Sequence, residues 1–436
     1  MNLPKDPDDD DLAGQIPSPV DDSRRSPARD SDVVGESQTP TNLNLPIDQN
    51  TRRRRAFLAG KDALRWWKDW GRDSLKSPPS VPGLSAGIAA RSKGLGPSVR
   101  PGFLTEISKS AMACQWDVFL NHGQYPWGAE FALTALEALE PLEAQLSVFR
   151  STSEVCQLNR TAFTAPVKVS DSLWNLLQLS KVLWELTEGA FDITSSSLSQ
   201  CWGFLKREGR MPSDQEVEEA LKSVGMEKVV LDPQQQTVQF FHPDLSINLG
   251  GIGKGWSLDQ VADGLQSAGV DDFVFHSGKS SVVARGTKLR EQAANPKSAN
   301  LKAANPGWQI GLSHPLLPSS RLGNIDLTDR ALGTSGSGRQ FIHYRGRRLS
   351  HILDPRSGRP AEGVLSATVL APTAAQADAL GTACFVLGVE GCQRLSQQCD
   401  DLGIILVIQE KSRSEVVLIG DIQQAWQPTA VKAGRR

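Results

Sequence analysis

The chain contains no Cys-x-x-Cys pair, although it has six cysteines, and this absence argues against a zinc site or a disulfide scaffold. It also lacks a run of about 20 apolar residues, which a membrane-spanning helix requires. No internal repeat is visible, and the net charge of −2 gives no overall attraction to nucleic acid or to a membrane. What remains is a chain of 436 residues, 39% of them hydrophobic, that is long enough to bury a substantial core.

The beginning of the chain differs in composition from the rest. Residues 1–51 carry eleven acidic side chains against four basic ones, so we expect a disordered acidic head. Residues 52–76 carry nine basic side chains against three acidic ones, interleaved with Trp66, Trp67 and Trp70. This pattern is typical of a solvated basic segment, or of an amphipathic helix that contacts a membrane surface or a partner. The acidic head has the opposite charge and can fold back on it.

Three segments of low structural content carry export, linker or loop signals. Arg54-Arg55-Ala56-Phe57-Leu58 resembles the start of a twin-arginine export signal, but no apolar run of about 7–15 residues follows it. The sequence therefore favours a cytoplasmic location over export. Residues 77–103 are rich in Pro, Gly and Ser, as linkers are. Residues 287–307, with two Ala-Asn-Pro copies, are typical of a loop inserted between strands.

Helical and strand-like segments alternate in the rest of the chain without the regular period of a doubly wound fold. We expect helices near residues 128–146, 171–187, 214–223, 256–268, 374–387 and 389–397. We expect strands near residues 115–120, 227–231, 237–241, 272–276, 309–313, 324–328, 364–370 and 403–409. Short turns at residues 232–236 and 345–348 join strand pairs. The sequence therefore predicts an α+β fold with a largely antiparallel or mixed sheet and packed helices.

One candidate site is the segment 351–360, which begins with His351 and continues through Asp354, Pro355, Arg356 and Gly358. Proline fixes one backbone dihedral and glycine opens another, so the segment predicts a tight turn that aims its polar neighbours. A surface turn with a structural histidine would have the same sequence.

A second candidate is the glycine-rich stretch from Asn248 to Lys254, which an apolar run precedes and an amphipathic helix follows. Glycines let the backbone approach a ligand closely, and the N-terminus of the following helix favours an anion. The stretch is not a P-loop, because Trp256 stands where Ser or Thr should follow the Gly-Lys pair, and the Rossmann spacing is absent.

A third candidate is the pair Asp378 and Thr382, which lie four residues apart and so share one helical face. A carboxylate and a hydroxyl suit magnesium, which prefers oxygen ligands. The alternative is structural: the helix dipole favours an aspartate near its start, and the threonine hydroxyl bonds back to a carbonyl.

Taken in order, these segments resemble the ApbE family, the magnesium-dependent flavin transferases that move FMN from FAD onto a protein hydroxyl. The resemblance extends over most of residues 105–425 and includes blocks at residues 111–114, 149–159, 189–194 and 332–338. Several ordered blocks are more specific than any single one. The resemblance implies one transferase domain over residues 104–427.

The resemblance also implies roles for matching positions. FAD contacts are expected at Met112, Phe149, Ala190, Phe191, Asp192, Asn248, Lys254 and Ile352. Magnesium ligands are expected at Gly251, through its carbonyl, and at Asp378 and Thr382. His351 falls where the family is thought to keep its catalytic histidine, which would take the proton from a Ser or Thr hydroxyl of an acceptor protein as AMP leaves. Asp354 and Arg356 would shape the turn and steady the phosphates.

The chain departs from the family pattern at three places. Asn248 stands where an aspartate is usual, Ala113-Cys114 where Gly-Thr is usual, and Lys279 lies in a segment that commonly contains Gly-Gly-Asp. These changes make the site less negative, which favours a pyrophosphate but weakens metal binding. Three alternatives therefore stay open: an FAD pyrophosphatase, a non-catalytic FAD-binding protein, and an interaction protein that acts through its basic N-terminal segment.

Overall fold

The computed structural model describes residues 102–289, 307–337, 341–410 and 413–429. The chain divides into two units, Met1–Arg52 and Arg53–Arg436, and every described residue belongs to the second. The predictions for residues 1–51 and 52–76, and nearly all of the predicted linker, lie outside the described residues. Within the described part, no helix is both long and apolar enough to cross a membrane.

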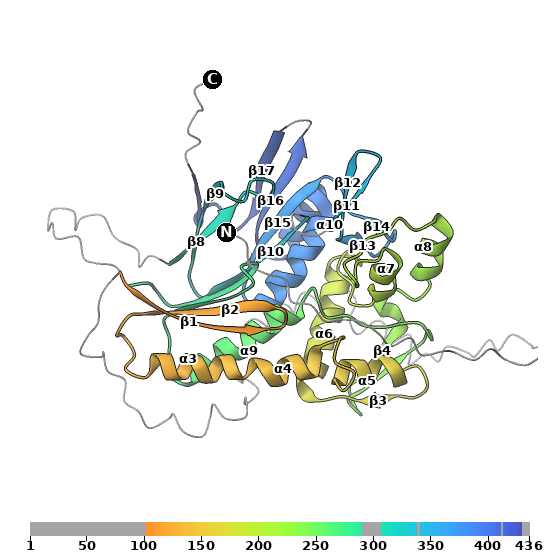
Figure 1. Ribbon diagram of the computed structural model, residues 1–436, viewed down its shortest axis with the longest axis horizontal. Coiled ribbons are helices and arrows are strands. Elements are labelled where there is room, and N and C mark those ends of the chain that lie inside the picture. Colours follow the sequence, from red (N-terminus) through yellow and green to blue (C-terminus); the bar gives the residue numbers. More distant parts are fainter. Residues whose placement is uncertain (1–101, 290–306, 338–340, 411–412, 430–436) are drawn as a thin grey trace, which may run out of the picture. The chain divides into compact units, whose positions relative to one another are not determined.

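The centre of the described part is an eight-stranded sheet in which every neighbouring pair is antiparallel (Figure 1). Its strands, in spatial order, are β1 (Leu104–Ala111), β2 (Cys114–Asn121), β6 (Phe273–Ser277), β7 (Ser281–Arg285), β10 (Arg330–Gly336), β15 (Val364–Ala371), β16 (Gly403–Glu410) and β17 (Arg413–Gly420). Together with the packed helices, this sheet confirms the predicted α+β class.

Helices cover one face of this sheet and a small second sheet covers part of the other. The main core contains side chains such as Trp116 and Phe275 together with α3 (Gly128–Glu137), α4 (Leu139–Leu146), α9 (Gly253–Ser267) and α10 (Ala374–Gln398). On the other face, side chains such as Val274 and Leu332 pack against β8 (Trp308–Ser313), β9 (Arg321–Leu327) and β18 (Trp426–Pro428). Successive side chains along each strand point to opposite faces of the sheet, so the same strands contribute to both packed layers.

The remaining elements lie beside this layered unit, on the α10 side (Figure 1). They comprise α5 (Glu154–Thr161), α6 (Asp171–Leu186), α7 (Ser196–Cys201), α8 (Asp214–Leu221), the 3-10 helix η1 (Met226–Lys228), and a sheet of β3 (Val167–Lys168), β5 (Thr237–Phe240) and β4 (Val229–Asp232). Two short hairpins follow β10: β11 (Phe341–Tyr344) with β12 (Arg347–Ser350), and β13 (Leu353–Asp354) with β14 (Arg359–Pro360). Both turns predicted at residues 232–236 and 345–348 join antiparallel strands.

The start of α10 is held by unusually close contacts. A Cβ atom added to Gly255 of α9 would lie 2.1 Å from the carbonyl oxygen of Ala374, so only glycine allows this approach. The Asp259 carboxylate accepts hydrogen bonds of 2.8 Å from the backbone N–H groups of Ala374 and Ala375. Burial raises the pKa of Asp259 to about 7. The helix that carries Thr382 is therefore fixed at its N-terminus.

Three helix predictions need comment. The single helix predicted over residues 128–146 is two helices, and Pro141 falls in the first turn of the second, where a missing N–H is tolerated. The helix after the glycine loop begins at Gly253 and is largely buried rather than amphipathic, because it packs against β6, β7, α3 and α10. The break predicted between residues 387 and 389 is confirmed by the non-helical backbone of Gly388.

Candidate functional site

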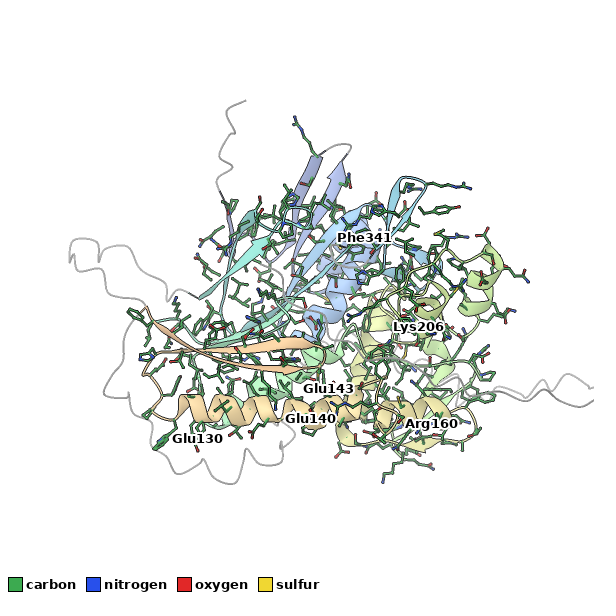
Figure 2. The ribbon with its side chains drawn as sticks, viewed as in Figure 1. Glu130, Glu140, Glu143, Arg160, Lys206 and Phe341 are labelled. Atoms are coloured by element: carbon green, nitrogen blue, oxygen red, sulfur yellow. The ribbon has the colours of Figure 1, made fainter. Side chains whose placement is uncertain are left out.

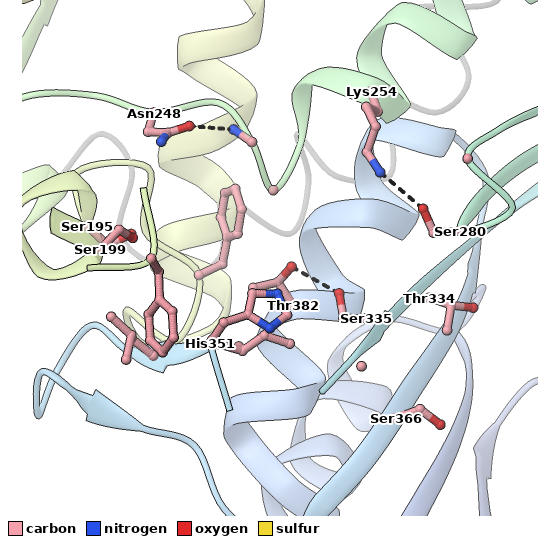
Figure 3. Close-up of a pocket in the computed structure, with 18 of the residues that line it drawn as sticks. Ser195, Ser199, Asn248, Lys254, Ser280, Thr334, Ser335, His351, Ser366 and Thr382 are labelled. Atoms are coloured by element: carbon pink, nitrogen blue, oxygen red, sulfur yellow. Dashed lines mark hydrogen bonds between the residues drawn. The ribbon is translucent and has the colours of Figure 1, made fainter. Parts of the chain in front are cut away.

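A cavity of about 810 Å³ lies where the glycine loop, the β6–β7 turn, the end of β10, α10 and the segment after β12 meet (Figure 3). Its wall includes ten of the twelve positions implied by the family resemblance, and the neighbouring Lys279. Those ten are the FAD positions Phe149, Ala190, Phe191, Asp192, Asn248, Lys254 and Ile352, the metal positions Gly251 and Thr382, and His351. Met112 and Asp378 are the two predicted positions that do not line it.

The glycine loop is shaped by Asn248. The backbone N–H of Asn248 donates a 2.7 Å hydrogen bond to the carbonyl of Ile193, and its Oδ1 atom accepts a 2.9 Å bond from the N–H of Gly250. A Cβ atom added to Gly251 would lie 3.4 Å from the ring of Phe191 and 3.7 Å from the Thr382 hydroxyl. The loop therefore brings main-chain atoms to the cavity wall, where a side chain would take up the space.

Two lysines from different elements face this cavity. Lys254, in the first turn of α9, donates a 3.1 Å hydrogen bond from its Nζ atom to the Oγ atom of Ser280 (Figure 3). The carbonyl of Ser280 accepts a 2.7 Å bond from the N–H of Thr334, so the β6–β7 turn is tied to β10. Lys279 lies in the same turn with a left-handed backbone, φ 65°. The arrangement supplies two positive charges and several hydroxyls for an anionic ligand.

A set of hard oxygen atoms lies across from the lysines. The Thr382 Oγ atom is 3.1 Å from the Oγ atom of Ser335, and the Gly251 main chain is close to it. Burial raises the pKa of Asp378 to about 6, while the Lys254 ammonium, the Ser281 hydroxyl and the Gly255 N–H act to lower it. A partly buried carboxylate beside carbonyl and hydroxyl oxygens has the donor chemistry of a magnesium site. In the described residues no group of three or more His, Cys, Asp or Glu side chains is arranged for a metal ion, so such a site would depend on this one carboxylate.

Asp192 lines the cavity, but its carboxylate is used within the fold. Its Oδ1 atom accepts a 2.8 Å bond from the N–H of Thr194 and a 2.6 Å bond from the Thr194 hydroxyl. Burial raises the pKa of Asp192 to about 6 against the effect of these bonds. The Thr194 hydroxyl in turn accepts a bond from the N–H of Gly225. Asp192 thus holds the loop that presents Ala190 and Phe191 to the cavity.

His351 comes directly after β12 and is half-buried at the cavity wall. Its ring meets the Phe204 ring edge-on, with the ring centres 6.3 Å apart. The next residue, Ile352, is buried and accepts a 2.9 Å backbone bond from Ala361. A packed ring and an anchored backbone orient the imidazole toward one part of the cavity.

The turn after His351 has the predicted form. Asp354 binds Arg356 through two bonds of 2.9 Å, from Nε to Oδ1 and from the terminal nitrogen to Oδ2. The carbonyl of Asp354 accepts a 2.8 Å bond from Gly358, whose φ of 70° places it in the left-handed region. The Arg356 guanidinium is therefore engaged within the turn, and the aliphatic part of the side chain lies beside Gly189. Its role in steadying phosphates stays a prediction.

Two predicted FAD positions lie differently from the rest. Phe149 lines the cavity with 80% of its surface exposed, so its ring is available to a ligand. Met112 lies in the β1–β2 turn, outside the cavity wall, and its N–H donates a 2.8 Å bond to Glu143. Its neighbour Cys114 approaches the cavity instead: a Cβ atom added to Gly278 would lie 3.2 Å from the Cβ atom of Cys114. Burial raises the pKa of this thiol, although the nearby Lys254 acts to lower it.

Sequence reasoning missed several residues of the wall. They include Ser280, Ser366, the segment around Phe204, Leu205 and Arg207, and the β8–β9 loop residues Ser313, His314, Pro315 and Pro318. No motif marks the hydroxyls of β15: Thr368 meets Thr334 of β10 only through strand pairing, with their Oγ atoms 3.0 Å apart. All six cysteines, by contrast, are free thiols.

Comparison with known proteins identifies the family of the chain. The ApbE family profile matches residues 112–406. The FAD:protein FMN transferase of Haemophilus influenzae is 28% identical over 312 residues, covering 69% of this chain and 86% of that protein. The Vibrio cholerae enzyme of the same name is 32% identical over 256 residues, covering 58% of this chain and 72% of that protein.

Solved structures show the same fold. The flavin transferase ApbE from Vibrio cholerae superposes with a TM-score of 0.62 at 25% identity, over 74% of this chain and all of that one. The ApbE protein of Thermotoga maritima gives the same TM-score at 26% identity, over 73% of this chain and 97% of that one. The fold and its cavity therefore define a member of a transferase family. The chain belongs to the ApbE family.

Proposed function

We propose that this protein transfers FMN from FAD to a Ser or Thr hydroxyl of an acceptor protein and releases AMP. The observation that carries the proposal is the convergence on one cavity of two lysines, a set of hard oxygen atoms and His351. The pyrophosphate of a dinucleotide needs the lysines and the hard oxygen atoms, and a hydroxyl that must lose a proton needs the histidine. The family and the names of its characterised members support the same reaction.

The residues around the cavity have different roles in this proposal. Lys254 and Lys279 bind the pyrophosphate oxygens, and the exposed Phe149 ring contacts the flavin. Magnesium, held by the Gly251 carbonyl, Asp378 and Thr382, would supply positive charge to the pyrophosphate. The donor set fits this ion because all three ligands are oxygens and one of them is a carboxylate that is partly shielded from solvent.

His351 acts as the general base in this proposal. The acceptor hydroxyl loses its proton to the imidazole while its oxygen forms a bond to the FMN phosphorus, and the bond from that phosphorus to the AMP oxygen breaks. An imidazole has an ordinary pKa of about 6.5, so it is largely neutral near physiological pH and able to accept a proton. Alignment of the two phosphates supplies much of the remaining rate.

A direct experiment tests the proposal. The purified protein is incubated with FAD, magnesium and a candidate acceptor, and AMP is measured together with flavin fluorescence on the acceptor band after denaturing electrophoresis. Release of AMP with labelled acceptor is the expected result. Release of AMP with water as the only acceptor would identify an FAD pyrophosphatase, and FAD binding without AMP would leave only a binding protein.

One observation favours the binding protein as a second candidate. The Oδ1 atom of Asn248 is engaged by the N–H of Gly250, and this side chain carries no charge where the family usually has an aspartate. Fewer negative charges near the proposed metal ligands weaken the binding of a divalent ion. A chelator titration distinguishes the transferase from the binding protein. A pure binding protein keeps its affinity for FAD when the chelator is added, and it shows no turnover.

A further inference from the structure

The hairpin of β11 and β12 carries a concentration of positive charge that the proposed chemistry does not use. Between Phe341 and Ser350 it contains Arg345, Arg347 and Arg348 and no acidic residue, although the whole chain has a net charge of −2. All three arginines are exposed. Among the described strands, β11 and β12 pair only with each other. The hairpin therefore projects basic side chains that no sheet partner covers.

The loop before α8 extends this basic surface. Lys206 and Arg207 are exposed, and a Cβ atom added to Gly209 in the same loop would lie 3.1 Å from the Ile342 side chain of the hairpin. Figure 2 labels Lys206 and Phe341 in the same region of the molecule. We call residues 203–210 and 341–350 together the basic rim.

The basic rim adjoins the cavity at two points. Arg207 and His351 both line the cavity, and His351 directly follows the last residue of β12. On the other flank, Arg348 donates a 2.6 Å hydrogen bond to the carbonyl of Ser337, next to the cavity residues Ser335 and Gly336. A chain lying on the rim would therefore reach the cavity where His351 stands.

The arginines are held in place by aromatic rings and by the turn. The Arg348 guanidinium lies 3.8 Å from the centre of the Phe341 ring, and that of Arg345 lies 5.1 Å from the centre of the Tyr344 ring. Cation–π contacts of this kind leave the charge of the guanidinium groups in place for a partner. Arg347 also forms an ion pair with the exposed Glu362, which an acidic partner would replace. Arg345 and Gly346 both have positive φ, 48° and 75°, as a tight hairpin turn requires.

We propose that the basic rim is the docking surface for the acceptor protein, and that it selects acceptors whose hydroxyl lies within an acidic segment. This inference rests on the proposed transfer reaction and adds the chemistry of its partner. Charge complementarity favours an acidic chain, which the arginines bind through paired hydrogen bonds. Docking there delivers the acceptor hydroxyl to the cavity beside His351.

Labelled synthetic peptides test the docking surface directly. Each peptide carries one threonine, with acidic, uncharged or basic flanks, and its binding to the FAD-loaded protein is followed by fluorescence anisotropy. The hairpin variant combines Arg345→Asp, which suits a left-handed position, with Arg347→Glu. The matched control combines Arg160→Glu in α5 with Lys168→Glu in β3, two exposed residues that are not part of the basic rim and do not line the cavity.

Wild-type protein and the control variant should bind the acidic peptide about tenfold more tightly than the uncharged one at low salt, with the difference shrinking as salt is added. The hairpin variant should lose this preference and bind the basic peptide instead, a gain that misfolding cannot produce. Equal affinity of the wild type for all three peptides, or equal losses in both variants, would overturn the proposal. So would binding to anionic lipid vesicles without any peptide preference. FAD titration of the same samples is independent: failure of the wild type to bind FAD would refute the transfer reaction itself.

Discussion

Lys254 and Ser280, which are 26 positions apart in the sequence, are joined by a 3.1 Å hydrogen bond from the lysine Nζ atom to the serine Oγ atom. This bond connects the glycine loop at the start of α9 with the β6–β7 turn. The glycine loop was predicted from sequence as an anion site, whereas Ser280 was not. Their contact gives the proposed pyrophosphate site two walls.

The first prediction is that FAD binds more tightly than FMN and that Lys254→Met removes most of this preference. Lys254 is the cation at the glycine loop, and a hydrogen bond to a charged group contributes about 1.5–3 kcal/mol, so FAD affinity should fall about tenfold or more. FMN affinity should change much less. Flavin fluorescence titration measures both. Equal wild-type affinity for FAD and FMN would show that these loops do not hold the pyrophosphate.

The second prediction is that His351→Ala lowers the transfer rate by about 10²–10⁴ while FAD affinity stays within a few-fold, because a general base acts mainly in the transition state. AMP release gives the rate and fluorescence titration gives the affinity. His242→Ala serves as the control, since His242 bonds only locally, to the N–H of Asp244. Near wild-type turnover in the His351 variant would leave that residue a structural member of the turn.

The parts of the fold that local sequence signals determine were predicted well. The β4–β5 and β11–β12 turns contain residues that favour tight turns, and the break at Gly388 follows from a residue that readily leaves helical geometry. Strand β10 was not predicted. Its sequence, from Arg330 to Gly336, is rich in small residues with low strand preference, and it forms a strand because β7 and β15 flank it and α10 packs closely on Gly333.

The site was predictable only where motifs mark it. The glycine loop, His351 and Thr382 stand in recognisable segments and reach one cavity. Arg207 carries no such signal, and the block at residues 332–338 marks Ser335 without indicating its contact with Thr382. Ser335 meets Thr382 because β10 lies against α10, and Arg207 reaches the cavity from a loop whose path depends on the hairpin beside it. Contacts between distant segments of this kind follow from packing, which a single sequence does not reveal.

The third prediction concerns Lys279, which lies in the β6–β7 turn at the cavity wall. Lys279→Ala should lower FAD affinity several-fold at low salt and less at high salt, because the side chain is exposed and its charge is screened. The loss should be larger in the presence of a chelator, where the lysines alone neutralise the pyrophosphate. Isothermal titration calorimetry at two salt concentrations checks this. An unchanged affinity under all conditions would exclude Lys279 from the FAD site.

The fourth prediction is that removal of residues 1–76 leaves folding and FAD binding unchanged. That region is polar and its charges are segregated along the sequence, so it has little apolar surface to add to a core. Thermal melting and FAD titration of the shortened protein provide the test. A large drop in melting temperature, or loss of FAD binding, would show that the Trp-containing basic segment packs on the transferase domain.

The last prediction links pH, magnesium and Asp378. Burial raises the pKa of this carboxyl from 3.8 to about 6, so the folded protein holds its proton more tightly than the unfolded chain does. The resulting contribution to stability is fully present below pH 3.8 and is lost as the pH rises through about 6. Without metal, Asp378→Asn should therefore have a higher melting temperature than the wild type at about pH 7.5. At about pH 4 the substitution should not raise the melting temperature.

Above about pH 6, magnesium should make the melting temperature of the wild type higher than that of Asp378→Asn, because the ionised Asp378 then has a cation to bind. A ligand that binds only the folded state raises the melting temperature. Asp263→Asn is the matched control: burial also raises the pKa of Asp263 to about 6, but this residue lies near Arg285, away from the cavity wall. The control should gain stability without metal in the same way and keep its response to magnesium, whereas Asp378→Asn should lose that response. Melting curves with magnesium and with a chelator measure both effects. If magnesium stabilises Asp378→Asn as much as wild type, then Asp378 does not hold the ion, and the proposed charge neutralisation of the pyrophosphate must come from the two lysines.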